Sequence, residues 1–424
     1  MSGGSSGANT PDGTTMRILV FTHYFWPEEF RINDCVAGLV ERGHEVTVVC
    51  GPPSYPQGEI YPAYAQRPES FTSYEGARVI RVPVLTRGRG GALRLMGNYL
   101  SAALSASTIG VWALRRSRFD VVFVFQPSPI TTALPAILFK ALKRTPIVMW
   151  VQDLWPDTLE ALGVVRSRAG LRLVELLVRF VYAGCDRVLV QSRAFIDNVQ
   201  RYAPSKTPLT YLPNWSDPAF LNPPSAPAPE VVDASAGFTI MFAGNLGEAQ
   251  DLLTVVQAAF LCRDVEGLRW IVVGDGSARA ATQNRVQELG IQDKVIFLGR
   301  HPSDRMPAFF AGADAMMLSL KAEPIFAMTI PSKLQSYMAS GRPVLCMVEG
   351  EAAEVVKEAG CGFTVAAGDA SGLAEAVRTL AALAADERSA MGENGRRFGQ
   401  ANFDRDLLID RLESELSAAA GTRQ

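Results

Sequence analysis

Two short apolar segments, each ending in a glycine-containing turn, constrain the fold of this 424-residue chain most strongly. FTIMFAGNLGEAQ begins at Phe238, and WIVVGDGSA begins at Trp270. Each pattern predicts a buried strand, a turn and a helix. Two such units close together predict a parallel sheet whose carboxyl edge presents backbone N–H groups, a setting that holds phosphate. Read singly, Gly244, Gly247, Gly274 and Gly276 are also compatible with simple turns.

The length favours two domains rather than one core. A proline-rich segment at residues 213–237 predicts the linker between them. Residues 1–15 hold no apolar run and are expected to be a disordered or artificial leader. The expected divisions are an N-terminal domain at 16–215, a C-terminal domain at 216–400, and a C-terminal helix at 401–424 that can return to the N-terminal domain.

The composition, 48% hydrophobic and 20% charged, is that of an ordinary globular protein. Residues 16–215 carry 23 Lys and Arg against 15 Asp and Glu, whereas residues 216–424 carry 18 against 27. The first half therefore either faces an anionic partner or has a basic solvated surface. The six cysteines lie far apart, without metal-ligand spacing, and are expected to be reduced core residues.

The expected fold class is α/β, with two Rossmann-like, doubly wound domains that face each other across a cleft. In the first half, apolar segments alternate with helical patterns, which predicts a parallel sheet. A GxGxxG dinucleotide motif does not follow the first of these segments. A ligand is expected in the cleft between the domains. The segment Arg17–Phe25 predicts a strand that ends in a polar, aromatic loop, and further strands are predicted at Glu45–Cys50, Val121–Gln126, Ile147–Asp153 and Arg187–Ser192.

Several motifs occur together in the order and spacing of a known family. GNLGEAQ, VVGDG, FLGRHP, PSKLQSYMASGRP and CGFTVAAGD resemble the sugar-nucleotide domain of GT-B glycosyltransferases, with glycosyltransferase family 4 the best fit. FTHYFWPEEF, GPPSYPQG and VQDLWPD resemble its bacterial branch that builds O-antigen, capsule and colanic-acid-like polysaccharides, which includes N-acetylfucosamine transferases. The resemblance covers roughly residues 16–405. It implies a retaining, metal-independent transfer from a nucleotide sugar.

The diphosphate of such a donor needs positive partners. Without an Asp-x-Asp motif or a His cluster for a cation, backbone amides, a helix N-terminus and a few cations must neutralise it. Lys333 is the preferred cation, because it stands in the first turn of the helix expected after Pro331; a surface lysine is the alternative. Arg300 is expected to contact the base or the phosphates, unless it too is a plain surface residue. The expected nucleotide-sugar residues are Gly244, Asn245, Gly274, Asp275, Arg300, Thr329, Pro331, Ser332, Lys333, Gln335 and Ser336.

The chain departs from the family pattern at its acidic pair. Many members carry a Glu-x7-Glu motif whose second Glu binds ribose. Here Met328 occupies the first position and Ser336 the second. Gln335, Ser336 and Glu323 are the candidate substitutes. Gln250 also replaces a basic residue that usually follows the first glycine turn. Similar departures occur in the polysaccharide branch.

Asp153, His23 and Glu323 are the expected catalytic residues. The family often presents a His at the end of the strand that here finishes with Asp153. A carboxylate there would orient the acceptor or accept its proton, although in retaining transferases the donor phosphate can itself be the base. A helix N-cap role for Asp153 stays open. His23 follows the first strand, where it would bind donor or acceptor, or lie in the core.

An uncharged stretch from Leu95 to Leu114 is flanked by arginines on both sides. Its length would permit a membrane span, but Asn98 and several hydroxyl residues dilute its apolarity. We expect a helix of the N-terminal domain whose outer face touches a membrane surface, with a fully buried helix as the alternative.

Together these observations predict a hexosyltransferase that moves a sugar, an N-acetylated hexose or deoxyhexose, from a UDP-sugar to a polyprenyl-diphosphate-linked glycan. The expected location is the inner face of the cell membrane, with no cofactor, no metal and no nucleic-acid partner. A transferase with a soluble acceptor and a nucleotide-sugar epimerase are alternatives. A binding protein without transfer activity remains a further alternative, because the Glu pair is missing.

Overall fold

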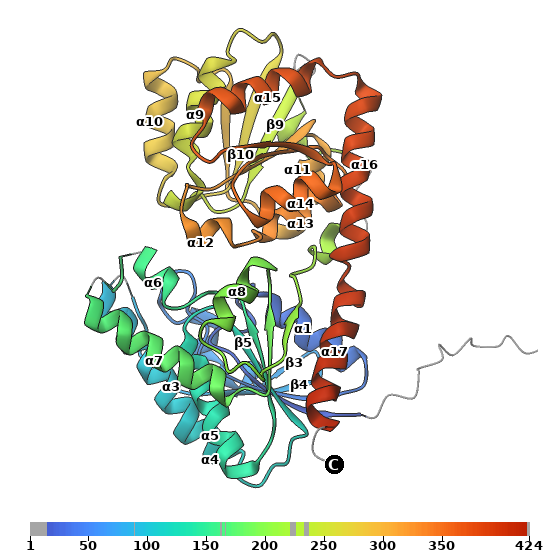
Figure 1. Ribbon diagram of the computed structural model, residues 1–424. Helices are drawn as coiled ribbons and strands as arrows, with labels where there is room; N and C mark the ends of the chain where they lie inside the picture. Colours follow the sequence, from blue (N-terminus) through green and yellow to red (C-terminus); the bar gives the residue numbers. More distant parts are fainter. Residues whose placement is uncertain are drawn as a thin grey trace, which may run out of the picture.

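The computed structural model of the chain describes residues 15–88, 90–161, 163–165, 167–220, 226–232 and 237–421. Two α/β units stand one above the other in Figure 1, each with a sheet between layers of helices. The expected leader lies outside the described residues except for Thr15, as do residues 221–225 and 233–236 of the proline-rich segment and the last three residues.

The sheet of the N-terminal unit comprises β1 (Arg17–Phe21), β2 (Glu45–Cys50), β3 (Ser73–Tyr74), β4 (Ala77–Arg81), β5 (Val121–Gln126), β6 (Ile147–Val151), β7 (Arg187–Val190) and β8 (Leu209–Tyr211). Their order is β3-β4-β2-β1-β5-β6-β7-β8, and only the β3–β4 pair is antiparallel. The inner strands are almost continuously apolar, because helices cover both faces of the sheet.

The helices of this unit are α1 (Arg31–Glu41), α2 (Pro62–Gln66), α3 (Ala92–Ser105), α4 (Val111–Ala113), α5 (Leu134–Lys143), α6 (Asp157–Ala161), α7 (Arg168–Gly184) and α8 (Ala194–Gln200). A π-helical turn, Ala106–Gly110, joins α3 to α4. The expected helix at 95–114 is therefore one helical run within the α/β alternation. Among the described residues, no helix is both long and apolar enough to cross a membrane.

The C-terminal unit is built on a second parallel sheet. Its strands are β9 (Phe238–Ala243), β10 (Leu268–Val273), β11 (Val295–Gly299), β12 (Ala315–Ser319), β13 (Val344–Met347) and β14 (Gly362–Val365), in the order β11-β10-β9-β12-β13-β14. Its helices are α9 (Leu252–Leu261), α10 (Arg279–Glu288), α11 (Met306–Ala311), α12 (Pro324–Ala327), α13 (Ser332–Ala339), α14 (Glu351–Ala359), α15 (Ala370–Ala382) and α16 (Ala385–Asn402).

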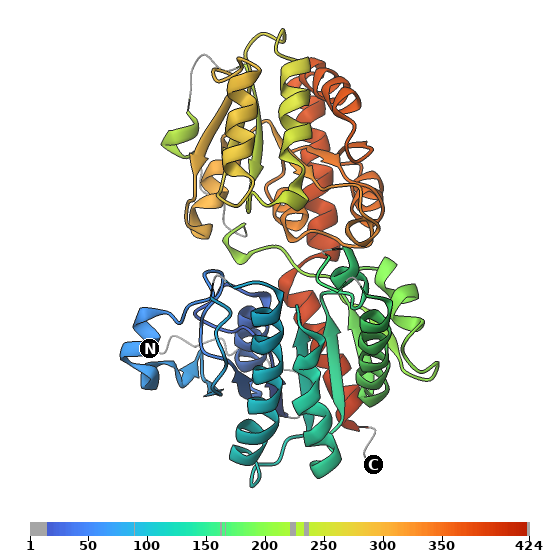
Figure 2. The same cartoon turned by 90° about the vertical axis from the view of Figure 1, so that its left-hand side faces the viewer.

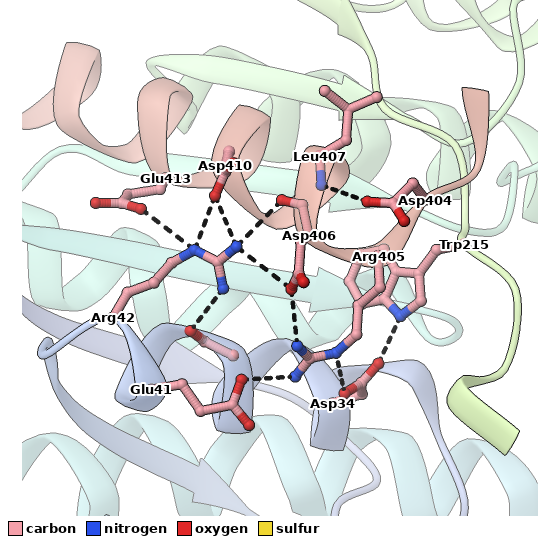
Figure 3. A network of polar contacts seen from close by, with 11 residues as sticks. Asp34, Glu41, Arg42, Trp215, Asp404, Arg405, Asp406, Leu407, Asp410 and Glu413 are labelled. Atoms are coloured by element: carbon pink, nitrogen blue, oxygen red, sulfur yellow. Dashed lines mark hydrogen bonds and ion pairs between the residues drawn. The ribbon is translucent and has the colours of Figure 1, made fainter. Parts of the chain in front are cut away.

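The last helix, α17 (Arg405–Gly421), packs on the N-terminal unit although it follows the C-terminal one (Figure 1). Leu408, Ile409 and Leu412 lie in the core between α1 and the sheet. Figure 3 shows the polar contacts at its start: Arg405 pairs with Asp34 at 2.7 Å and with Glu41 at 3.1 Å. These contacts fix α17 to α1.

The pattern analysis predicted most strands but not their ends. The first strand ends at Phe21, before the polar, aromatic loop that was expected after it, and the strand expected at Ile147–Asp153 stops at Val151. In both cases the polar residues after the strand form the loop at the carboxyl edge. The strands β3, β4 and β8 were not anticipated. All six cysteines are free and buried, as expected.

Candidate active site

The carboxyl ends of β9, β10 and β11 form one wall of an open cleft of about 370 Å³ between the two units. Five expected donor-binding residues line this cleft: Gly244, Asn245, Gly274, Asp275 and Arg300. They come from three different turns, and the parallel sheet brings them to one edge. The opposite wall belongs to the N-terminal unit and consists of Glu29, Tyr55 and Pro56.

Two glycines are required where the first two turns meet. Gly244 and Gly274 have φ angles of 134° and 137°, in the region that L side chains rarely adopt. A Cβ on Gly274 would lie 1.9 Å from the Gly244 carbonyl oxygen. The Gly244 N–H donates to the Val273 carbonyl at 2.9 Å. This amide is therefore engaged within the protein, and the contribution of Gly244 to the site is open space.

Lys333 occupies the space beside Gly244. The expected helix begins at Ser332, so Lys333 lies in the first turn of α13. Its Nζ would lie 3.2 Å from a Cβ on Gly244 and sits 4.0 Å from the centre of the Phe242 ring. Burial against apolar groups lowers the pKa of Lys333 to about 7. No carboxylate of the described residues forms an ion pair with it.

Gln250 holds Lys333 in this position. Lys333 Nζ donates to Gln250 Oε1 at 2.6 Å. The backbone of Gln250 is itself fixed, because its carbonyl accepts from the buried Ser319 hydroxyl at 2.6 Å. Gln250, which stands where a basic residue is usual in the family, therefore orients Lys333. The sequence showed the substitution but not this contact, which joins residues 83 positions apart.

Lys333 adjoins the cleft through Gly244 but is not one of its lining residues, and neither are the other candidates on α13 or just before it. Gln335 is fully buried, and its amide nitrogen, correctly oriented, donates to the Pro331 and Ser332 carbonyls at 3.0 Å. It thus stabilises the start of the helix. Thr329 donates to the Ile325 carbonyl at 3.0 Å. Ser332 is exposed, and Ser336 is half-buried on α13.

His301 completes the C-terminal wall of the cleft, next to the exposed Arg300. Its Nε2 contacts the Leu298 carbonyl at 3.2 Å, and its Nδ1 contacts an Arg305 N–H at 3.2 Å. A carbonyl only accepts and a guanidinium only donates, so Nε2 donates to Leu298 and Nδ1 accepts from Arg305. The ring also packs 4.6 Å from that of Phe309. These contacts make His301 a rigid, flat wall.

Glu28 orders the N-terminal wall. It is only 1% exposed, and its two carboxylate oxygens accept from the backbone N–H groups of Ser54, Tyr55 and Phe25 at 2.7, 2.7 and 3.1 Å. These bonds tie the loop after β1 to the loop after β2. Burial raises the pKa of Glu28, whereas the three N–H donors favour the ionised form. Glu29 is thereby presented to the cleft.

Asp153 lies beyond the end of β6, on the N-terminal side of the interdomain region. Its carboxylate accepts from the Thr158 hydroxyl at 2.5 Å. Helix α6 begins only at Asp157, so this contact with a hydroxyl, rather than helix capping, holds the side chain. Burial raises the pKa of Asp153, which makes the carboxylate a stronger proton acceptor. Asp153 is not among the residues that line the interdomain cleft.

His23 is buried at the same sheet edge. Its Nε2 contacts Asn98 Oδ1 at 3.0 Å, and its ring packs 5.6 Å from that of Tyr99. Burial lowers the pKa of His23 to about 4, so the ring is neutral at pH 7. With 8% of its surface exposed, His23 lies in the interior beside α3. The Tyr99 ring lies 6.1 Å from that of Trp155, close to Asp153 in the chain.

Glu323, the third expected catalytic residue, is exposed just before α12. Helix α12 bridges the units: Ile325 lies in the core of the N-terminal unit, and Phe326 and Met328 pack against that core. Met328 occupies the position that carries the first Glu in many relatives. Here it makes an apolar contact between the two units. Within the described residues, no group of three or more His, Cys, Asp or Glu side chains is placed to hold a metal ion.

Sequence reasoning missed the wall that the N-terminal unit contributes. Glu29, Tyr55 and Pro56 belong to the FTHYFWPEEF and GPPSYPQG motifs, which were noticed only as marks of a family branch. Ser303 and Met306, after β11, were also missed. The conjunction of Glu, Tyr and Pro in two loops that follow neighbouring strands was the available signal.

Comparisons with known proteins agree with this geometry. The model of the glycosyl transferase 4-like domain matches residues 29–215, and that of glycosyl transferases group 1 matches residues 232–398. The chain is 28% identical to the putative colanic acid biosynthesis glycosyl transferase WcaI of Escherichia coli K12, over 77% of this chain and 82% of that protein. It is 23% identical to the probable glycosyltransferase WbjE of Pseudomonas aeruginosa, over 75% and 80% of the two chains.

A solved structure shows the same arrangement of the two units. Anabaena HepE, crystallised with UDP, superposes with a TM-score of 0.69 at 16% identity, covering 95% of this chain and 100% of that one. Two parallel-sheet units with an intervening cleft are the GT-B fold. The two family models fall one on each unit and together extend over most of the chain. The chain therefore belongs to the GT-B glycosyltransferases and is an enzyme that transfers sugars.

Proposed function

We propose that this enzyme transfers an N-acetylated hexose or deoxyhexose from a UDP-sugar to a polyprenyl-diphosphate-linked glycan, with retention of configuration and without a metal ion. The reaction would serve bacterial surface polysaccharide synthesis. WcaI, whose name places it in colanic acid biosynthesis, and WbjE support this context. The HepE complex with UDP supports the choice of nucleotide.

The observation that carries the proposal is the unpaired ammonium of Lys333 beside Gly244. Gln250 holds this ammonium next to the Gly244 turn, which is one of the three turns that line the cleft. A diphosphate in this cleft would replace the absent carboxylate partner and form charge-assisted hydrogen bonds. Arg300 and the flat ring of His301 would then border the nucleoside. A leaving UDP needs this kind of charge stabilisation when no metal takes part.

Asp153 would serve the acceptor. It stands on the opposite unit, and its raised pKa suits a group that accepts the proton of the attacking hydroxyl. The donor phosphate is the second candidate base. In either case Asp153 orients the hydroxyl, since Thr158 fixes its carboxylate. The apolar helix run at 95–114 would keep this unit at the inner membrane surface, where a lipid-linked acceptor resides.

The test is incubation of the full chain with a UDP-N-acetylhexose and a polyprenyl-diphosphate-linked sugar, with and without EDTA. We expect UDP release, a lipid that is heavier by one sugar, and an anomeric NMR signal of the same configuration as the donor. Inversion of configuration, or loss of turnover in EDTA, would contradict the proposed mechanism.

The same assay separates the alternatives. Transfer to a water-soluble glycan but not to the lipid would favour a soluble acceptor. Conversion of the UDP-sugar into its epimer would favour an epimerase. Tight UDP-sugar binding without even slow hydrolysis would favour a binding protein.

A further inference from the structure

Three helices of the N-terminal unit expose large apolar side chains on one continuous face. Figure 2 looks onto this face, where α3, α5 and α7 lie side by side. They cover the side of the sheet opposite α1 and α17. Twelve of the sixteen most exposed large apolar residues of the described chain fall between Leu85 and Phe180. Monomeric soluble proteins rarely show so large an apolar patch without a partner.

Helix α7 carries the clearest stripe. Leu173, Leu176 and Phe180 are 69%, 64% and 55% exposed and follow the i, i+3, i+7 spacing of one helix face. The opposite face of α7 packs on the sheet through Val178, Val181 and Tyr182. The helix is therefore apolar on both sides. Packing against the sheet accounts for only one of these two apolar sides.

Helix α3 repeats the arrangement on the other edge of the face. Its stripe consists of Leu93, Leu100 and Leu104, and Trp112 extends it beyond the π-helical turn. Leu138 and Leu142 on α5 join the two stripes. The Arg115 guanidinium lies 3.8 Å over the Trp112 ring, a pairing of apolar ring and cation that suits the boundary of a bilayer.

The charge around these stripes is mostly positive, although α7 also carries Glu175. Residues 76–152 contain eleven Lys and Arg but a single acidic residue, Asp120, which pairs with Arg17 at 2.8 Å. Arg168, Arg172 and Arg179 add positive charge along α7. A second copy of the chain on a two-fold axis would place such arginines against their own kind. An anionic bilayer instead offers negative headgroups to the arginines and an apolar layer to the exposed apolar side chains.

We infer that α3, α5 and α7 form a single membrane-binding face, with α7 as a second apolar stripe that enters an anionic bilayer beside α3. The inference rests on the proposed function and deepens it, because it names the surface through which the enzyme reaches a lipid-linked acceptor. Helix α6, whose Thr158 holds Asp153, directly precedes α7 and lies on the same side of the molecule (Figure 1). Asp153, the proposed acceptor residue, is thus held by the helix that leads into α7.

Flotation of the full chain with vesicles tests this face. The wild type should float with phosphatidylcholine vesicles that contain phosphatidylglycerol, and less with phosphatidylcholine alone. Leu173→Gln, Leu176→Gln and Phe180→Gln together should weaken vesicle binding about tenfold or more, because three apolar side chains leave the acyl boundary. The matched control, Val232→Gln with Leu253→Gln, changes exposed apolar residues of the C-terminal unit and should float like the wild type.

A second variant does not depend on the apolar stripe. Arg168→Ser with Arg172→Ser changes two exposed arginines and should weaken binding to the anionic vesicles only, more so at low salt. Two results would overturn the inference: wild-type protein that stays free with both vesicle types, or an α7 variant that floats like the wild type. A wild-type dimer that the α7 variant dissociates would also overturn it, because a second copy would then cover the face.

Two further measurements distinguish this inference from the proposed function. The α7 variant should retain the UDP affinity of the wild type and its turnover with a water-soluble acceptor analogue, because the cleft is unchanged. A wild type that floats but transfers no sugar would refute the proposed function and leave the membrane-binding face standing.

Discussion

In the proposed donor site, Lys333 is the side chain on which binding of the diphosphate depends. Removing its ammonium leaves a diphosphate without its charge-assisted partner, a loss of about 1.5–3 kcal/mol. Lys333→Ala should therefore weaken UDP binding about tenfold to a hundredfold and leave uridine binding nearly unchanged. Calorimetric titration of both ligands gives the comparison, with Lys357→Ala as control because Lys357 is an exposed lysine paired with Glu354. Equal losses for UDP and uridine would place Lys333 away from the phosphates.

The pKa of Lys333 predicts how UDP affinity depends on pH. In the free protein this pKa is about 7, and the negative diphosphate should raise it. Between the two values the complex carries a proton that the free protein lacks, so binding takes up a proton. UDP affinity should therefore fall as pH rises from about 7.5 to about 9.5. Lys333→Arg should bind UDP without this dependence, because arginine stays charged; an unchanged slope would contradict the assignment.

The same pKa also affects stability, with the opposite sign. Burial lowers the folded-state pKa of Lys333 from 10.5, so the unfolded chain binds more protons between about pH 7 and 10.5. The contribution of this group to the free energy of unfolding therefore rises with pH across that window. Lys333 costs stability at neutral pH, which is common for residues placed to bind a ligand.

Asp153 should show the same conflict between stability and function. Its burial raises the pKa above the unfolded value, so its ionised form destabilises the fold at neutral pH. Asp153→Asn should match or exceed the wild type in thermal stability at pH 8, bind UDP normally, and lose most transfer activity. Thermal unfolding and the lipid-acceptor assay together give the answer. Wild-type turnover in this variant would limit Asp153 to a structural role.

Single residues differed in how far the sequence could place them. Lys333 was predicted because Pro331 marks a helix start locally, and Gly244 and Gly274 because turns after apolar strands need positive φ. The burial of His23 could not be predicted, because it depends on Asn98, 75 residues away. Glu29 and Tyr55 were missed because they meet the donor turns only across two domains.

Among the elements, α17 makes the clearest test of packing energetics. Arg405 contacts Asp34, whose carboxylate also accepts from Trp215 Nε1 at 2.5 Å (Figure 3). The Arg405 and Asp34 side chains are only 15% and 23% exposed. Arg405→Ala leaves this carboxylate poorly compensated and should lower the free energy of unfolding by about 2 kcal/mol. Denaturant unfolding measures the change.

Arg378→Ala is the matched control for this prediction. Arg378 also pairs with an aspartate, Asp264 at 2.6 Å, but both side chains are well exposed. Solvent screens such pairs, so the unfolding midpoint should hardly move. Equal effects of the two variants would show that burial of the Arg405 pair contributes nothing to the docking of α17.

The elements also show why amphipathic patterns are only partly informative. The alternation of apolar strands with helices predicted the sheets, because each element buries a continuous apolar stripe. The same rule cannot tell which stripe of α7 meets the sheet, since both of its faces are apolar. The edge strands β3 and β8, of two and three residues, are too short for a periodic signal.

At the scale of the whole molecule, the chain crosses between the units twice, and the crossings touch. The Ser216 N–H donates to the Phe403 carbonyl at 3.2 Å, where the linker meets the junction of α16 and α17. Elsewhere Arg193 of α8's start contacts Glu358 of α14 at 3.3 Å, and α12 contacts α6. The two units are therefore joined by the linker hydrogen bond, by one ion pair and by one helix–helix contact. This arrangement suits a donor that is held between the two walls of the cleft.

The most direct test of the central claim, a nucleotide-sugar transferase with its donor in this cleft, is a thermal-shift panel of UDP, GDP, ADP and their sugars in EDTA. We predict that UDP and UDP-sugars stabilise the protein, by about 2.7 kcal/mol at a hundredfold excess over the dissociation constant, and that the other nucleotides do so far less. If no nucleotide shifts the unfolding temperature, or if only added divalent ions allow a shift, the account is contradicted.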